Sequence, residues 1–207
     1  MTVARPAARP RLAVPPARLI RLHLASRAVP AGLLVFAGCA VSLRVALHWI
    51  PPAGAGAREL PLLIEAAAAA VIGIVSRSPF GEPERATGRW LPFLRLGAAV
   101  TLTAAAFGAL AAGSAAAHLD YGHLGLVRDL AGMTGVALLA AAAAGGNLAW
   151  LGPLGFWAIA VAREWSTPWI WPGRPPHDLG AALCAALVFA LGAAVTAIRG
   201  ARDQAGV

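Results

Sequence analysis

Six long apolar runs dominate this chain and restrict it to folds in which most of the outer surface faces lipid. The runs cover residues 29–49, 60–75, 91–117, 124–144, 148–162 and 179–198. A helix of about 20 residues crosses the hydrocarbon core of a bilayer, within a range of roughly 17–25. We therefore expect six transmembrane helices. The third run is long enough to tilt, and the fifth is short and contains Gly152 and Pro153.

The composition agrees with a membrane protein and excludes a membrane barrel. Hydrophobic residues make up 59% of the 207 and charged residues only 13%, about half the share usual in soluble proteins. Barrel strands alternate apolar and polar residues, whereas these apolar runs are continuous. The expected fold class is all-α: a polytopic integral membrane helical bundle of six transmembrane helices, with an N-terminal interfacial amphipathic helix.

The expected organisation has four parts. Residues 1–10 form a disordered N-terminal tail, 11–28 the interfacial helix, 29–199 the transmembrane domain and 200–207 a cytosolic tail. The interfacial helix is predicted from "ARLIRLHLASRA" at 17–28, which combines leucines that enter the bilayer with arginines that reach the headgroups. The alternative for this segment is a solvated basic tail.

The arginines predict the orientation in the membrane. Six spans put both ends of the chain on one side, and basic residues favour the cytosol. With the N-terminus inside, the cytosolic segments hold twelve arginines: Arg5, Arg9, Arg11, Arg18, Arg21, Arg27, Arg77, Arg85, Arg89, Arg95, Arg199 and Arg202. The outer segments hold four: Arg58, Arg128, Arg163 and Arg174. We expect a multi-pass protein of the cell membrane with both termini cytosolic. The tryptophans of the outer segment 164–178 suit the headgroup belt.

Several classes of function are excluded. All 17 basic residues are arginines, so a phosphate-binding loop that needs a lysine cannot exist, and any ATPase activity would belong to a partner. The arginines flank apolar runs and form no basic stripe with interleaved aromatics, which argues against nucleic acid. No Gly-x-Ser-x-Gly motif supports nucleophilic catalysis. Cys39 and Cys184 lie in apolar runs and are expected to be packing thiols. We expect neither an enzyme nor a cofactor.

Arg44 and Glu65 are charged residues inside expected spans. Each lies five residues from the outer end of its span, so both are roughly 7.5 Å below the outer surface. Buried charges in a membrane usually pair or line a pathway. We expect an Arg44–Glu65 pair between the first two spans. The alternatives are that Glu65 handles a solute or proton, or that each side chain reaches the outer headgroups.

The loop "AAAHLDYGHLGLVRD" contains the remaining candidates for a metal site. His118, Asp120 and His123 have a spacing that can bring metal ligands together, and His177 with Asp178 could complete a site. Gly122 interrupts the segment, so helical spacing is not assured. Histidine-bearing loops usually bind nothing, and we expect no metal here.

The segment 76–95, "SRSPFGEPERATGRWLPFLR", is the most charged part of the chain. The expected orientation makes it the main cytosolic connection, between the second and third spans. Glu82 and Glu84 followed by Arg85 and Arg89 suit the dipole of a short helix. The alternative is a solvated connector anchored by Trp90 and Arg95.

This layout resembles the six-span permease subunits of ABC exporters that lack a fused ATPase. Such permeases begin with an interfacial helix, as "ARLIRLHLASRA" does here. Their connection between spans two and three carries an acidic coupling helix that docks on a separate ATPase, in the position of "GEPERATGRWLPFLR". A broken element is frequent near their fifth span, where this chain has "NLAWLGPLGFWAIA". The resemblance covers residues 11–200 and rests on layout, without a sharp motif.

The resemblance implies that Glu82, Glu84, Arg85 and Arg89 form a coupling loop to a separate nucleotide-binding ATPase subunit. It also implies a homodimer or a second permease subunit, and export of an apolar or amphipathic compound. The main alternative is a non-transporting membrane accessory, scaffold or immunity protein. An intramembrane enzyme using the outer histidine and aspartate groups is the third class.

The orientation gives a first prediction. In a chain whose two cysteines are replaced, Glu82→Cys should resist a membrane-impermeant thiol reagent in intact cells and react after permeabilisation. Ala53→Cys, in the expected outer connection, is the matched control and should react in intact cells. Labelling of position 82 from outside would reverse the orientation.

Overall fold

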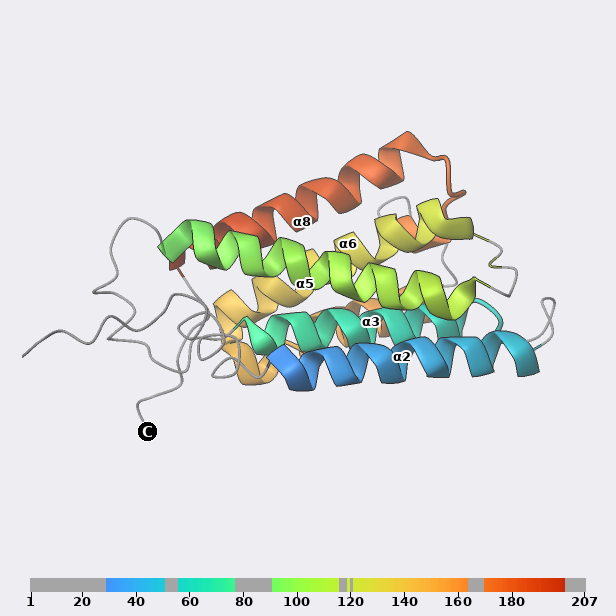
Figure 1. Cartoon of the computed structure of the whole chain (residues 1–207). Helices are drawn as coiled ribbons and strands as arrows, with labels where there is room; N and C mark the ends of the chain where they lie inside the picture. Colours follow the sequence, from blue (N-terminus) through green and yellow to red (C-terminus); the bar gives the residue numbers. More distant parts are fainter. Residues whose placement is uncertain are drawn as a thin grey trace, which may run out of the picture.

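The computed structural model describes residues 29–50, 56–76, 91–115, 119, 121–163 and 170–199. In these ranges the chain forms six α-helices and two short 3-10 helices (Figure 1). The α-helices are α2 (Val29–Trp49), α3 (Glu59–Val75), α5 (Leu91–Ser114), α6 (Gly122–Ala144), α7 (Leu151–Ala162) and α8 (Leu179–Arg199). The 3-10 helices are η2 (Gly146–Leu148) and η3 (Trp171–Gly173). The all-α class expected from the apolar runs is confirmed.

Four of the helices, α2, α5, α6 and α8, are long and apolar enough to cross a membrane. This supports a multi-pass membrane protein. Helices α3 and α7 have 17 and 12 residues, and both coincide with apolar runs. Six membrane-crossing spans therefore stay a prediction, although each expected span corresponds to a helix.

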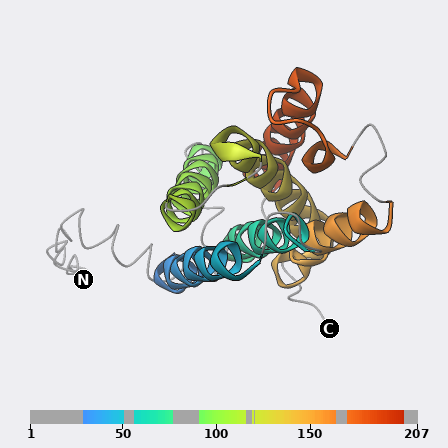
Figure 2. The same ribbon diagram turned by 90° about the vertical axis from the view of Figure 1, so that its right-hand side faces the viewer.

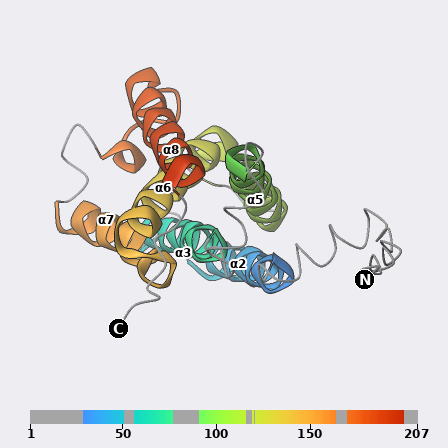
Figure 3. The ribbon, with the colours of Figure 1, turned by 90° about the vertical axis from the view of Figure 1, so that its left-hand side faces the viewer.

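Helix α6 lies in the middle of the bundle. It packs most extensively against α8 and also contacts α3, α7 and α5, while α2 lies against α3 and α5. The end-on views show α6 between α8 and α3 (Figures 2 and 3). The colours of Figure 1 show α2, α3, α5 and α6 running in alternating directions, as short connections require. One end of the bundle therefore holds the end of α2 and the starts of α3, α6 and α8.

The outward and inward faces of the helices differ as lipid requires. On α2 the buried residues Phe36, Cys39 and Leu43 recur at helical spacing, and they pack in the main apolar cluster with α3, α5 and α6. On α8 the large leucines point outward at four-residue intervals: Leu179, Leu183, Leu187 and Leu191. Such exposed leucines along a helix are suited to contact with acyl chains.

The segment after α6 is broken, as the short fifth apolar run indicated. Gly145 ends α6 with φ of 93°, a backbone conformation that residues with a side chain rarely adopt. The chain then makes η2 before α7 begins. The fifth expected span is therefore a 3-10 turn followed by a short helix.

Some expected parts lie outside the described residues. They are the tail 1–10, the interfacial segment 11–28, the charged residues at 82–89 and the tail 200–207. The structure leaves the expectations for these parts as predictions.

Glycines let α6 and α8 approach closely. A Cβ atom added at Gly135 would lie 2.5 Å from the carbonyl oxygen of Val188, and one added at Gly192 would meet the carbonyl oxygen of Gly135. The buried Thr196 hydroxyl donates to the carbonyl oxygen of Leu138 at 3.3 Å across the same contact. Close backbone approach of this kind is how helices associate in lipid, where burial of apolar surface gives little driving force.

The α6–α8 contact gives the second prediction. Gly192→Ala should lower the free energy of unfolding by about 1–3 kcal/mol, because the added methyl group meets the backbone of α6. The matched control is Gly108→Ala in α5, where nothing lies within 4 Å of the added atom. The control should be neutral or slightly stabilising. Unfolding in detergent measures both, and equal effects would show that α6 and α8 are not in backbone contact.

Candidate functional site

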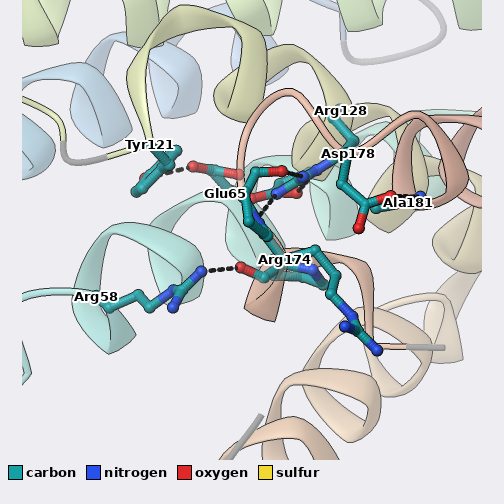
Figure 4. Close-up of polar contacts among 10 residues, drawn as sticks. Arg58, Glu65, Tyr121, Arg128, Arg174, Asp178 and Ala181 are labelled. Atoms are coloured by element: carbon teal, nitrogen blue, oxygen red, sulfur yellow. Dashed lines mark hydrogen bonds and ion pairs between the residues drawn. The ribbon is translucent and has the colours of Figure 1, made fainter. Parts of the chain in front are cut away.

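A buried polar cluster lies where α2 ends and α3, α6 and α8 begin, and this is called the polar end of the bundle (Figure 4). Its charged side chains come from α3, α6 and the connection before α3. The cluster residues are Arg58, Glu65, Tyr121, Arg128 and Asp129. Backbone carbonyls of the segment 172–175, which precedes α8, complete it.

Glu65 is fully buried on α3, among the alanines and leucines that face the core. Its Oε1 atom accepts a hydrogen bond of 2.8 Å from the hydroxyl of Tyr121, the residue before α6. Burial, together with the nearby carboxyl of Glu65, raises the pKa of Tyr121 above its usual range. The phenol is therefore the proton donor in this bond and stays neutral.

Arg128 connects α6 to the segment that precedes α8. Its Nε donates to Oδ1 of Asp129 at 2.8 Å. Its Nη1 donates to the carbonyl oxygen of Pro175 at 2.8 Å, and Nη2 to that of Arg174 at 3.3 Å. The side chains of Arg128 and Asp129 are only 3% and 1% exposed. A planar guanidinium can meet three acceptors in this way, which an ammonium group cannot match in geometry.

The segment before α8 is held by further contacts. The Arg58 side chain donates to the carbonyl oxygen of Pro172. Trp171 is buried and stacks on Phe156 of α7, with ring centroids 4.3 Å apart. Asp178 caps α8, since its Oδ1 accepts from the backbone N–H of Ala181 at 3.0 Å. Trp171 therefore packs inside the bundle, and the headgroup position expected for the tryptophans of this segment is wrong for this residue.

A pocket of about 320 Å³ opens beside the cluster. Its walls come from the end of α2, the start of α3 and the segment 173–176, with Leu119 and Tyr121. Leu47 and Ile50 supply apolar wall, while Arg58 and Tyr121 supply polar groups. Tyr121 therefore belongs to both features, because it lines the pocket and also donates to Glu65.

The expected pair of Arg44 with Glu65 is not formed. Glu65 bonds to Tyr121, and Arg44 is exposed on α2. The two residues share a depth, but Leu43 points into the core and Arg44 follows it about 100° round the helix. Equal depth therefore does not bring the side chains together. The exposed position of Arg44 agrees with the alternative that it reaches the headgroups.

Of the residues considered for a metal site, those that the structure describes are not brought together. His123 is exposed on α6, and Asp178 is used as a helix cap. His118 and Asp120 lie outside the described residues. Within the described ranges, no three histidine, cysteine or acidic side chains form a group that could hold a metal ion. Glu82, Glu84, Arg85 and Arg89, the expected coupling residues, also lie outside the description.

Tyr121, Arg128 and Asp129 are not among the site residues expected from the sequence. The sequence nevertheless contains a signal for this site, because Arg128 and Asp129 are adjacent charged residues inside the apolar run 124–144. Arg128 was assigned to the outer surface in the arginine distribution, whereas it is buried within α6. An acid and a base side by side in an apolar helix indicate a buried polar site.

No family model, curated protein or solved structure matches the chain. The fold alone therefore defines its class. It is an all-α protein with four helices able to cross a membrane and a buried polar cluster at one end of the bundle.

The cluster gives the third prediction. Arg128→Met should lower the free energy of unfolding by about 3–5 kcal/mol, because it leaves the buried carboxylate of Asp129 without its cation. Arg44→Met, the same change at an exposed position, is the control and should stay within about 0.5 kcal/mol. Unfolding in detergent measures both. Equal losses for the two variants would contradict a role of Arg128 in holding the polar end.

Proposed function

We propose that the chain is the membrane-spanning permease subunit of an ABC-type exporter. It exports an apolar or amphipathic compound, and a separate ATPase subunit hydrolyses the ATP. The observation that carries the proposal is the pocket at the polar end, within a bundle that has four candidate membrane-spanning helices.

The lining of the pocket supports an amphipathic compound. Leu47, Ile50 and Leu119 offer apolar contact, and the Arg58 side chain and the Tyr121 ring flank them. Its volume of about 320 Å³ falls at the lower end of the usual 300–1,000 Å³ for small-molecule sites. Mostly apolar walls with a few polar groups are typical of sites that bind small organic molecules.

The position of the charged segment supports the coupling part of the proposal. Helix α3 begins beside the pocket at Glu59 and ends at Val75, and the segment 76–95 follows it. At 1.5 Å per residue, the 17 residues of α3 make this helix about 25 Å long. A pocket beside the start of α3 and a charged segment after its end suit a protein that binds solute on one side and an ATPase on the opposite side.

A second membrane subunit, either a copy of this chain or a different permease, completes the proposal. The apolar outer residues of α2, α5 and α8 are suited to lipid or to such a subunit. The absence of lysine from the whole chain supports an ATPase on another polypeptide.

A non-transporting accessory, scaffold or immunity protein is the second candidate. The observation that favours it is the set of bonds holding the segment before α8 to α3 and α6, including those of Arg58 and Arg128. These bonds make the polar end rigid, which suits a scaffold better than a gate. Coupling to an ATPase separates the two candidates.

The fourth prediction tests that coupling. The tagged chain, purified from native membranes in mild detergent, should retain an ATPase subunit whose activity it stimulates. Reversing both acidic residues, Glu82→Arg with Glu84→Arg, should leave insertion intact and remove the stimulation. The control is Glu59→Arg, the same charge reversal at the opposite end of α3, and it should keep the stimulation.

Two outcomes decide between the candidates. If the double variant retains and stimulates the ATPase like the original chain, the segment is only a connector. If the unaltered chain retains no ATPase, the non-transporting accessory is the better function.

A further inference from the structure

Two buried carboxyl groups lie on neighbouring helices, and each has only one of its two oxygens hydrogen-bonded. Glu65 on α3 uses Oε1 to accept from Tyr121, and Asp129 on α6 uses Oδ1 to accept from Arg128. Their second oxygens, Oε2 and Oδ2, are inaccessible and have no hydrogen-bond donor in the described chain. The two carboxyl groups are close enough to interact electrostatically. A buried acceptor without a donor is costly, so this arrangement needs a physical explanation.

The surroundings of the two carboxyl groups differ. Asp129 has a guanidinium in direct contact, at 2.8 Å. Glu65 receives one hydrogen bond, from a neutral phenol, and the charge of Arg128 has only a weak effect on it. Of the two carboxyl groups, Asp129 therefore has the stronger support for a negative charge, and Glu65 is the one more readily held as the neutral acid. Two carboxyl groups in contrasting surroundings commonly share their protons unequally in this way.

Among the described residues, further groups of neighbouring elements also act on the cluster. From α6 and the residue before it, the groups that interact with Glu65 are Tyr121, Arg128 and Asp129. The positive charge of Arg58, the residue before α3, interacts electrostatically with Asp129 and Tyr121. The Arg58 side chain also donates a hydrogen bond to the carbonyl oxygen of Pro172. The segment before α8 contributes backbone carbonyls, which face Arg128 and Arg58.

We infer that Glu65 and Asp129 together form a binding site for one proton, carried on Oε2 of Glu65 and facing the carboxylate of Asp129. The proton converts Oε2 from an acceptor into a donor, and a hydrogen bond from Oε2 to Oδ2 of Asp129 would account for both unpaired oxygens at once. It also removes one of two negative charges from an environment that excludes water. The inference concerns the cluster itself and does not depend on the proposed transport function.

Tyr121 gives the proton a route to the pocket. Its hydroxyl is bonded to Oε1 of Glu65, and the same residue lines the pocket. A proton arriving from the pocket binds the phenol oxygen while the phenol's own proton passes to Oε1 of Glu65. A half-turn of the carboxyl group then exchanges its two oxygens, so that the protonated oxygen takes the place of Oε2 and the other accepts from the phenol. The phenol ends neutral, and the carboxyl gains one proton without any change in electrons. Release follows the same steps in reverse.

The fifth prediction tests the proton directly. Infrared spectra of the full chain in liposomes at neutral pH should contain the carbonyl band of a protonated carboxylic acid, shifted by D₂O. Glu65→Gln should remove the band, because its amide replaces the acid. Glu59→Gln, the same change at the start of the same helix, is the control and should leave it unchanged.

Isotope labelling assigns the band in the unaltered chain, without any substitution. In the unaltered chain, glutamate labelled with ¹³C at the side-chain carboxyl should shift the band, and aspartate labelled in the same way should not. A neutral-pH spectrum without such a band, or a band that belongs to aspartate, would overturn the assignment to Glu65. Glu65→Gln should also keep the melting temperature, since the amide mimics the neutral acid. A large loss in stability would mean that Glu65 is ionised.

A separate measurement tests the proton route through Tyr121. Tyr121→Phe should keep the band but slow its exchange in D₂O about 100-fold, the lower end of what a positioned proton carrier contributes. Unchanged exchange would show that protons reach Glu65 by another path, and the role of Tyr121 would then be wrong.

Discussion

The buried guanidinium of Arg128 is the group on which the polar end depends. A charge inside a membrane bundle must be matched by partners, because neither water nor lipid can stabilise it there. Arg128 meets this requirement with one carboxylate on its own helix and two carbonyls of the segment before α8. Since those carbonyls lie close to the cap at Asp178, the same charge determines where α8 begins relative to α6. An electrostatic requirement inside one helix thus becomes a constraint on how two helices are placed.

Close packing of small residues is the second interaction that holds α8 against α6. In lipid, helices gain little by burying apolar surface, so close contact and internal hydrogen bonds must hold them together. Gly135 and Gly192 provide the contact between α6 and α8, and Thr196 adds a hydrogen bond to the α6 backbone. Together with Arg128, they fix α8 at two heights along α6. The exposed leucines of α8 need no such close contact or hydrogen bond. This explains why the outer face of α8 is almost uniformly leucine, whereas its inner face combines alanine, glycine and threonine.

The sequence predicts the helices well and the site poorly, and the reason is physical. Helix limits depend on the length of apolar runs, and α2 has the expected bounds because the Pro51–Pro52 pair and two glycines follow the run. Contacts depend on which face of a helix turns inward, and depth in the membrane does not reveal this. Arg44 and Glu65 share a depth, yet one is exposed and the other buried. Tyr121 lies in a connection, where only the folded chain shows that it reaches Glu65.

Helix α3 links the features that a transporter would need. It is largely buried, it starts beside the pocket, and the charged segment follows its other end. Its alanines at positions 66–70 present a smooth surface, along which a helix can shift against its neighbours without losing interlocking side chains. A shift of α3 would move Glu65 relative to Asp129, because these two residues belong to different helices. The energy of two nearby carboxyl groups depends on their separation, so such a shift would change how firmly their proton is held. Under the proposed function, an event at the charged segment would therefore reach the pocket through α3 and Tyr121.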